Sequence, residues 1–362
     1  MKERRKRNMS GTGLLFMFCL LMLCGCAQIT GFMENTEVSG REVESLAAEK
    51  EDDTVLLGGM PVGIYKETDG VLVLDTEKMT GMDGKEYTPA QGVVSSGDYI
   101  TEVNHQKIEG KKQLMDLVEH LDGEKVLLTV RRENTILEKK LTPVQISKGN
   151  YRLGIWVRDN VQGLGTITFL TKNNRFAALG HGIHDIDTST LLTIKRGTLY
   201  RTSIQKVQKG SKGNPGTMEG IIVYNRFHQL GVIEKNTDAG IYGELNSDRS
   251  WIGEEVPIQV AKKEEIKMGE ARIRCYIDGE VKEYTICITQ IDKESDQVNK
   301  GMVIQVTDTE LLEKTGGIIQ GMSGSPIIQN GKLIGAVTHV FVQDSTKGYG
   351  IFIENMLKEE ES

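Results

Sequence analysis

Apolar and polar residues alternate over short stretches through most of the chain after residue 150. Examples are GLGTITFL, ARIRCYI and SPIIQNGKLIGAVTHVFV, and glycine, asparagine or aspartate separates such stretches. A period of two is typical of half-buried strands, and turn residues at these intervals favour antiparallel barrels or sandwiches. The sequence therefore predicts a mainly β domain over residues 148–362, with no long amphipathic helix before its C-terminal end.

Residues 55–147 mix strands with one helix. The stretch KKQLMDLVEHL places Leu114, Leu117, Val118 and Leu121 on one helical face. KVLLTVRRENTILEKKL predicts a hairpin, and SSGDYITEVNHQKI predicts a turn followed by a strand. The order strand, strand, helix, strand predicts a small α+β domain.

This segment resembles a PDZ domain, and SGDYITEVNHQKI is its most recognisable stretch. PDZ domains add an extended peptide to a sheet edge, and their backbone N–H groups capture its terminal carboxylate. By position, this carboxylate loop is expected at Gly59, Met60, Val62, Gly63 and Ile64, where Pro61 removes one donor. The alternative is a docking domain that packs on its neighbour and binds no peptide.

Residues 1–30 have the pattern of an export signal. A basic head, MKERRKRN, precedes the apolar run Leu14–Cys24, which has the length of a secretory signal core. The segment fits a cleaved signal peptide, a signal anchor, or a lipoprotein signal in which LCGC makes Cys26 the lipidated residue. All three export the body, which we expect to be membrane-associated. Residues 31–54 are acidic and are interpreted as a solvated linker.

Charge and cysteine content narrow the possible partners. The chain carries a formal net charge of -7, and a nucleic-acid partner is not expected because phosphate binding needs a basic face. The body holds two cysteines, Cys275 and Cys287, which could form a disulfide or remain buried thiols. Without paired metal-binding spacings there, we expect neither a metal nor a cofactor.

The stretch GMSGSP carries a candidate nucleophile, Ser323. A serine hydroxyl needs a histidine to take its proton, an acid to orient that histidine, and N–H groups that bind the developing oxyanion. Glycines allow the backbone to turn such N–H groups inward, so the amides of Gly321 and Ser323 are the expected donors. The plain alternative is an ordinary Gly/Ser turn.

His181 is the best candidate base because RFAALGHG predicts a strand that ends in a glycine-bounded turn. His184 is the nearby rival, and HGIHDID could also hold a metal, although no third ligand motif accompanies it. Spacing does not choose the orienting acid among the aspartates between His181 and Ser323. These are Asp185, Asp187, Asp238, Asp248, Asp278, Asp292 and Asp308.

The two motifs and the preceding PDZ-like segment together resemble the stage IV sporulation protein B family of serine peptidases. The matching stretches are ALGHGIHDIDT and GIIQGMSGSPIIQNGKLIGAVTHVFVQDSTKGYGIFIENML. The resemblance implies a chymotrypsin-like double β-barrel with Ser323 as nucleophile and His181 as base. It also implies that Asp308 stands where the family has a functionally implicated acid.

The same resemblance implies an exported endopeptidase in the forespore intermembrane space. Such an enzyme cleaves itself, including its own N-terminal region, and cleaves a membrane-bound regulator to trigger late sigma-factor processing. Two alternatives remain. One is a non-catalytic, membrane-tethered PDZ adaptor. The other is an HtrA-like quality-control protease, in which the PDZ domain follows the peptidase domain instead of preceding it.

Overall fold

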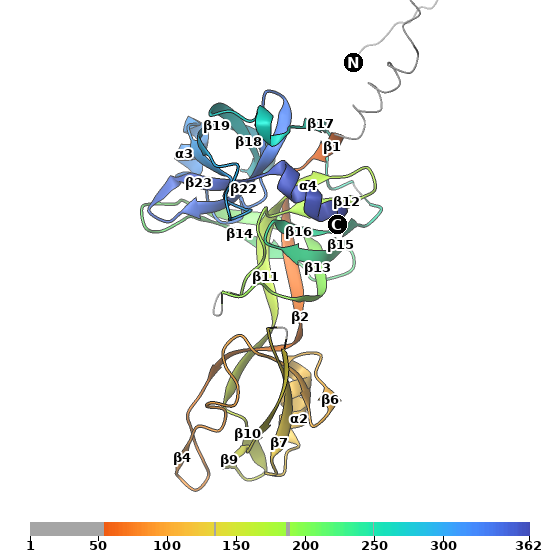
Figure 1. The fold of residues 1–362 in the computed structure, drawn as a ribbon, viewed down its shortest axis with the longest axis vertical. Helices are drawn as coiled ribbons and strands as arrows, with labels where there is room; N and C mark the ends of the chain where they lie inside the picture. The colour runs from red at the N-terminus through yellow and green to blue at the C-terminus, as the bar shows by residue number, and fades with distance from the viewer. Residues whose placement is uncertain (1–53, 134, 186–188, 249) are drawn as a thin grey trace, which may run out of the picture. The chain divides into compact units, whose positions relative to one another are not determined.

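The computed structural model describes residues 54–133, 135–185, 189–248 and 250–362. Strands predominate there and form two barrels and a smaller domain (Figure 1), which confirms the prediction of a mainly β protein. The expected signal segment 1–30, with Cys26, and the linker up to Asp53 lie outside these residues. No helix of the described ranges is long and apolar enough to cross a membrane.

Six antiparallel strands close the first barrel. Their order around the barrel is β2, β11, β12, β16, β15 and β13, and β13 pairs again with β2. Val62, Ile64, Ile167, Phe176 and Leu199 contribute to the buried core. The strands of this part are β1 (Thr54–Leu57), β2 (Pro61–Thr76), β11 (Ile155–Leu170), β12 (Arg175–Ala178), β13 (Ile194–Gln208), β14 (Thr217–Ile222), β15 (Gln229–Thr237) and β16 (Gly240–Leu245).

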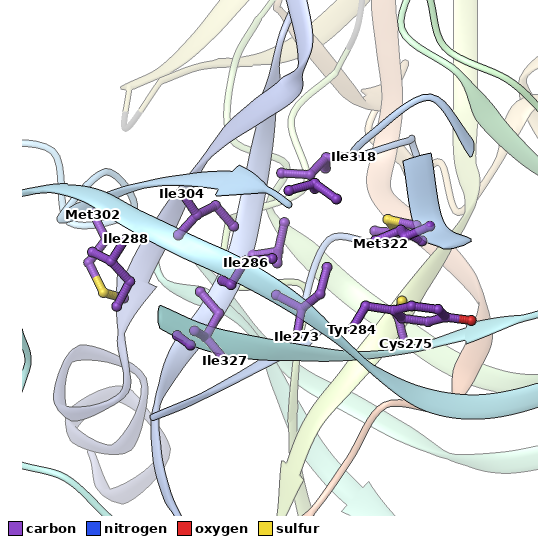
Figure 2. Close-up of a cluster of buried hydrophobic side chains, with 14 of the residues drawn as sticks. Ile273, Cys275, Tyr284, Ile286, Ile288, Met302, Ile304, Ile318, Met322 and Ile327 are labelled. Atoms are coloured by element: carbon purple, nitrogen blue, oxygen red, sulfur yellow. The ribbon is translucent and has the colours of Figure 1, made fainter. Parts of the chain in front are cut away.

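The second barrel closes in the same way through β18, β19, β20, β23, β22 and β21. Figure 2 shows its core, where Ile273, Ile286, Ile304 and Ile327 meet from four different strands. The elements are β17 (Pro257–Val260), η1 (Lys263–Glu265), β18 (Gly269–Ile277), β19 (Glu280–Ile291), β20 (Met302–Val306), α3 (Thr309–Thr315), β21 (Pro326–Gln329), β22 (Lys332–Phe341), β23 (Asp344–Phe352) and α4 (Ile353–Glu361). The two closed barrels match the expected double-barrel architecture.

The smaller domain is built on the second half of β2 and the first half of β11. β5 pairs with β2 and β7, β7 pairs with β8, and α2 packs its Leu114 face onto the buried core. Its further elements are β3 (Met79–Thr80), β4 (Glu86–Tyr87), β5 (Tyr99–Val103), β6 (Gln106–Lys107), α2 (Lys111–Glu119), β7 (Val126–Arg132), β8 (Thr135–Leu141), β9 (Val144–Ser147) and β10 (Asn150–Arg152). The predicted sequence of strands around one helix is present.

The expected boundary of the PDZ-like domain at residue 55 is wrong. β2 and β11 form one long ladder that serves both domains, and the core of the small domain extends from Val71 to Val157 (Figure 1). Residues 54–67 belong to the first barrel instead, through the pairings of β1 and of the first half of β2. The peptidase domain is therefore discontinuous in sequence.

The expected carboxylate loop at Gly59, Met60, Val62, Gly63 and Ile64 is wrong for the same reason. Val62, Gly63 and Ile64 pair with β11 on one edge and with β13 on the other, so no row of N–H groups is free for a peptide. Met60 packs in the barrel core, and the Gly59 amide donates to the carbonyl of Ile167. A strand paired on both sides cannot accept an added strand.

The two cysteines of the body are free thiols. They lie on neighbouring strands, where Cys275 faces Lys282 and Cys287 faces Glu270 in the ladder, so neither faces the other. Burial raises the pKa of Cys275 to about 12, and the carboxylate of Asp308 adds to this effect. A buried thiol with so high a pKa is chemically inert at neutral pH.

Candidate active site

Ser323 lies in the loop between α3 and β21, and the second barrel anchors this loop. The side chain of Met322 is buried in the barrel core (Figure 2), which leaves the neighbouring Ser323 half-buried at the surface of the core. The backbone at Gly321 and Gly324 has φ of 102° and 93°. A Cβ on Gly324 would lie 2.0 Å from the carbonyl oxygen of Thr166, so glycine is required there.

The first barrel holds the other side of this loop. The Thr166 amide donates to the Ser323 carbonyl at 2.9 Å, and the Thr166 hydroxyl donates to the Gly321 carbonyl at 2.9 Å. The Thr168 hydroxyl donates to the Gly324 carbonyl at 2.8 Å. Strand β11 therefore fixes the serine loop of one barrel against the other barrel.

His181 follows β12 in a turn where Leu179 and Gly180 both have positive φ. A Cβ on Gly180 would lie 3.1 Å from Thr338, which places this turn directly against β22. The rings of His181 and His339 are in contact, with centroids 4.6 Å apart and planes tilted by 34°. The Ser323 hydroxyl donates to the carbonyl of Thr338 at 2.8 Å. The serine and the histidine, which are 142 residues apart, therefore meet at adjacent residues of β22.

The hydrogen bonds of His181 determine which ring nitrogen can act as a base. Nδ1 lies 2.8 Å from the carbonyl oxygen of Gly182, and a carbonyl can only accept. Nδ1 therefore carries the proton, and Nε2 keeps its lone pair. Burial lowers the pKa of His181, and the nearby His184 lowers it further. The imidazole is thus neutral at pH 7, as a general base must be.

The amides of Gly321 and Ser323 are available to a ligand. Neither donates to an acceptor among the residues that the structure describes, whereas the neighbouring amides of Met322, Gly324 and Ser325 all donate to carbonyls of the chain. Most buried backbone amides in folded proteins are paired, so these two half-buried amides beside the serine hydroxyl are donors that a bound ligand can use.

The hydrogen bonds of Asp308 are made within the second barrel. It is the N-cap of α3, where Oδ1 accepts from the Leu311 amide at 3.0 Å and Oδ2 accepts from the Thr285 amide at 3.2 Å. Both carboxylate oxygens are therefore engaged by backbone of the second barrel. The partner of His181 Nδ1 is the Gly182 carbonyl instead.

The other aspartates considered from sequence have separate partners. Asp185 is buried and pairs with Arg158 at 3.1 Å, and Asp278 pairs with Lys314 at 2.7 Å. Asp238 Oδ1 lies 3.7 Å from Nε2 of His184. Asp248 and Asp292 accept from backbone amides two residues ahead, and Asp187 lies outside the described residues. Across the described ranges, no group of three or more potential ligands could hold a metal ion.

Sequence reasoning missed two residues that hold the histidine loop. The side-chain oxygen of Asn236 accepts from the backbone amide of Ile183 at 2.8 Å. Its side-chain nitrogen donates to the backbone carbonyls of Ile183 and Leu192 at 3.0 and 2.9 Å. The fully buried Lys66 also donates to the Leu192 carbonyl, at 2.6 Å, and burial lowers its pKa to about 7. In sequence each lies in a run of polar residues, KETD and EKNTD, so no local signal identifies it.

The smaller domain has a groove in a different place from the expected loop. It lies between α2 and the Asn150–Val157 segment, has a volume of about 340 Å³, and is lined by apolar residues including Leu114, Val118 and Leu153. At Ile155–Val157, β11 pairs with β2 along one edge, and no strand of the described residues pairs with its other edge. The open edge beside a helix is the geometry that admits an added peptide strand.

Comparison with known proteins places the chain among peptidases. The family model of SpoIVB peptidase S55 matches residues 149–357. A putative zinc metalloprotease of Helicobacter pylori strain J99 is 31% identical over 110 residues, which cover 27% of this chain. The chain spans about a third of the length of that curated relative (31%).

Two solved structures are similar to parts of this chain. The active form of the Rv3671c protease from M. tuberculosis is 14% identical with a TM-score of 0.32, over 56% of this chain and 73% of that one. The PDZ domain of an SdrC-like protein from Listeria monocytogenes is 24% identical with a TM-score of 0.20, over 25% of this chain and 87% of that one.

Proposed function

Because the chain belongs to the SpoIVB peptidase S55 family and is a serine peptidase, we propose that Ser323 is its nucleophile and His181 its general base. One observation carries this proposal. The Ser323 hydroxyl and the His181 ring both contact the Thr338–His339 segment, beside two amides that have no acceptor among the described residues. An ordinary Gly/Ser turn would not need a histidine loop from the other barrel.

We propose the following reaction. Rotation about χ1 of Ser323 breaks its hydrogen bond to Thr338 and turns the hydroxyl towards Nε2 of His181. As Oγ attacks the peptide carbonyl carbon, its proton passes to Nε2, and the Gly321 and Ser323 amides bind the oxyanion. The imidazolium then protonates the leaving amine. Water hydrolyses the acyl-enzyme by the same steps in reverse order, which restores the serine.

The expected substrates are part of the proposal. We infer an exported, membrane-associated enzyme of the forespore intermembrane space that cleaves its own N-terminal region and a membrane-bound regulator of late sigma-factor processing. The basic and apolar segment 1–30 supports export, and the acidic stretch Glu34–Asp53 supports a self-cleavage zone because acidic stretches with few large apolar residues are accessible to proteases. The family supports the link to sporulation.

The groove beside α2 supports a role for the smaller domain in delivering the substrate. An extended segment can pair with the open edge of β11 at Ile155–Val157, while its side chains enter the apolar groove. Met115 lines the groove and is exposed, so Met115→Lys would place a charge there without disturbing the core. If the smaller domain delivers the substrate, Met115→Lys should cleave a protein substrate more slowly than the wild type. A reagent that reacts with active-site serines should still label Ser323 to the same extent.

The nucleophile is tested by treating the full chain with a fluorophosphonate and measuring intact mass. One adduct on the wild type and none on Ser323→Ala is the expected result. Ser325→Ala is the matched control, since this serine is buried two residues away and has no hydrogen-bond partner for its hydroxyl in the described chain. Ser323→Ala should also lose the shortened self-processing products. Labelling of Ser323→Ala to the same extent as the wild type, or no labelling of the wild type, would instead favour a non-catalytic PDZ adaptor.

A further inference from the structure

Four large apolar side chains are exposed within seven residues at the end of β14 and in the loop that follows. Ile221, Val223 and Tyr224 are all exposed, and Phe227 has 93% of its surface accessible. Single exposed apolar residues are common on soluble proteins, but a cluster of them marks an interaction surface. We call residues 221–228 the aromatic loop.

The aromatic loop has a defined conformation. The Tyr224 hydroxyl donates to the Gln162 side chain at 2.6 Å, and its ring packs against Tyr65 and Tyr200 with centroids 5.2 Å apart in both cases. The Asn225 side chain accepts from the amides of Phe227 and His228. The fold therefore presents Phe227 outward on a supported turn, so little conformational entropy is lost when a surface binds it.

The stretch of sequence that carries the loop has a positive net charge, opposite in sign to that of the whole chain. Residues 197–233 contain five lysine or arginine residues and one acid, Glu219, whereas the chain as a whole has a formal net charge of -7. Arg226 lies inside the loop, is exposed, and forms no ion pair among the described residues. Arg201, in the same stretch, interacts with a carboxylate, since it helps to lower the pKa of Asp248. Arg226 is therefore the better residue for testing how positive charge affects binding.

We propose that the aromatic loop docks on the surface of an anionic lipid bilayer, with Phe227 entering the boundary between headgroups and acyl chains and Arg226 meeting the lipid phosphates. Aromatic residues next to arginine suit this boundary because the rings supply apolar surface and the arginine binds phosphate. Positive charge on a protein of negative net charge complements an anionic leaflet. The inference does not depend on the chemistry of Ser323 or on the N-terminal segment.

The test places a reporter at the tip of the loop. The full chain with Phe227→Trp is mixed with vesicles of equal parts phosphatidylcholine and phosphatidylglycerol that carry brominated acyl chains. Bromine quenches tryptophan at short range, so we expect emission from residue 227 to be quenched, and less so at high salt. The parent chain, which has two tryptophans, supplies the background. Met268→Trp is the matched control, since Met268 is 68% exposed on the second barrel.

Two further variants test the contribution of charge and the alternative that the loop is a dimer interface. Adding Arg226→Glu to the reporter chain should weaken vesicle binding by about tenfold or more, because each basic residue near such a surface contributes about 1 kcal/mol. Absent quenching, equal quenching of Met268→Trp, or equal binding to pure phosphatidylcholine would overturn the proposal. A dimer in solution that Phe227→Ser abolishes, without lipid quenching, would overturn it in favour of an interface between two copies of the chain.

Discussion

The hydroxyl of Ser323 donates its hydrogen bond to the carbonyl of Thr338, with 2.8 Å between the two oxygens. Thr338 is itself held, since its own hydroxyl donates to the Asn299 carbonyl at 2.8 Å. The nucleophile therefore rests on the backbone of β22, while the imidazole contacts the next residue, His339. A single such bond contributes about 1 kcal/mol, so bound substrate can readily supply the energy that turns the hydroxyl towards the base.

Asp308→Asn distinguishes a helix cap from a triad acid. Asparagine caps helices about as well as aspartate, but its NH2 group cannot accept from the Thr285 amide, so we expect the free energy of unfolding to fall by about 1–3 kcal/mol. We also expect kcat/KM to fall less than tenfold, because the structure gives both carboxylate oxygens to backbone amides. Replacing a true orienting aspartate with asparagine costs about 10⁴ in kcat. A loss of that size in a variant that is still folded would return Asp308 to the triad.

His184→Gln tests the electrostatics of the base. Burial and His184 both lower the pKa of His181, so the neutral, competent form persists below the ordinary range of histidine. We expect the acid limb of kcat/KM against pH to lie below about 6.5 in the wild type. Removing His184 removes one lowering effect, so the limb should move to higher pH. A limb that does not move, or moves to lower pH, contradicts this explanation.

Asn236 is a positioning residue, because its amide clamps the loop that carries His181 and touches no reacting atom. Asn236→Ala leaves the amide of Ile183 and two carbonyls without this partner. We expect kcat to fall by about 10-fold to 100-fold with KM nearly unchanged, since a small displacement of a base lowers the rate of chemistry rather than binding. Steady-state kinetics on one peptide substrate measures this. A rise in KM alone would show that the clamp serves substrate binding.

Lys66→Met tests the buried ammonium group. The pKa of Lys66 falls from its usual 10.5 to about 7 in the folded chain, so between these values the unfolded chain binds more protons. Stability should therefore rise with pH from about 7 to about 10.5 in the wild type, by up to several kcal/mol. Methionine does not titrate, so the variant should lose this rise.

Denaturant unfolding of wild type, Lys66→Met and the exposed control Lys212→Met at several pH values measures the effect. The control should keep the rise of the wild type. If the free energy of unfolding depended on pH in the same way for the wild type and Lys66→Met, Lys66 would be solvated in the folded chain.

Local patterns in the sequence determined much of the candidate site. The glycines around Ser323 and before His181 are needed for backbone with positive φ, so short motifs identified both loops. Alternation of apolar and polar residues likewise identified strands such as β18 and β22. These features depend on neighbours in the chain, and a single sequence therefore contains them.

Only the tertiary structure decided which strands pair and which polar groups meet. Alternation reports which face of a strand is buried, but it does not name the strand's neighbours. Val62–Ile64 therefore looked like part of a PDZ-like domain, although β11 and β13 enclose it in the first barrel. Asn236 and Lys66 meet the histidine loop only after the barrel closes, because their partners lie far away along the chain.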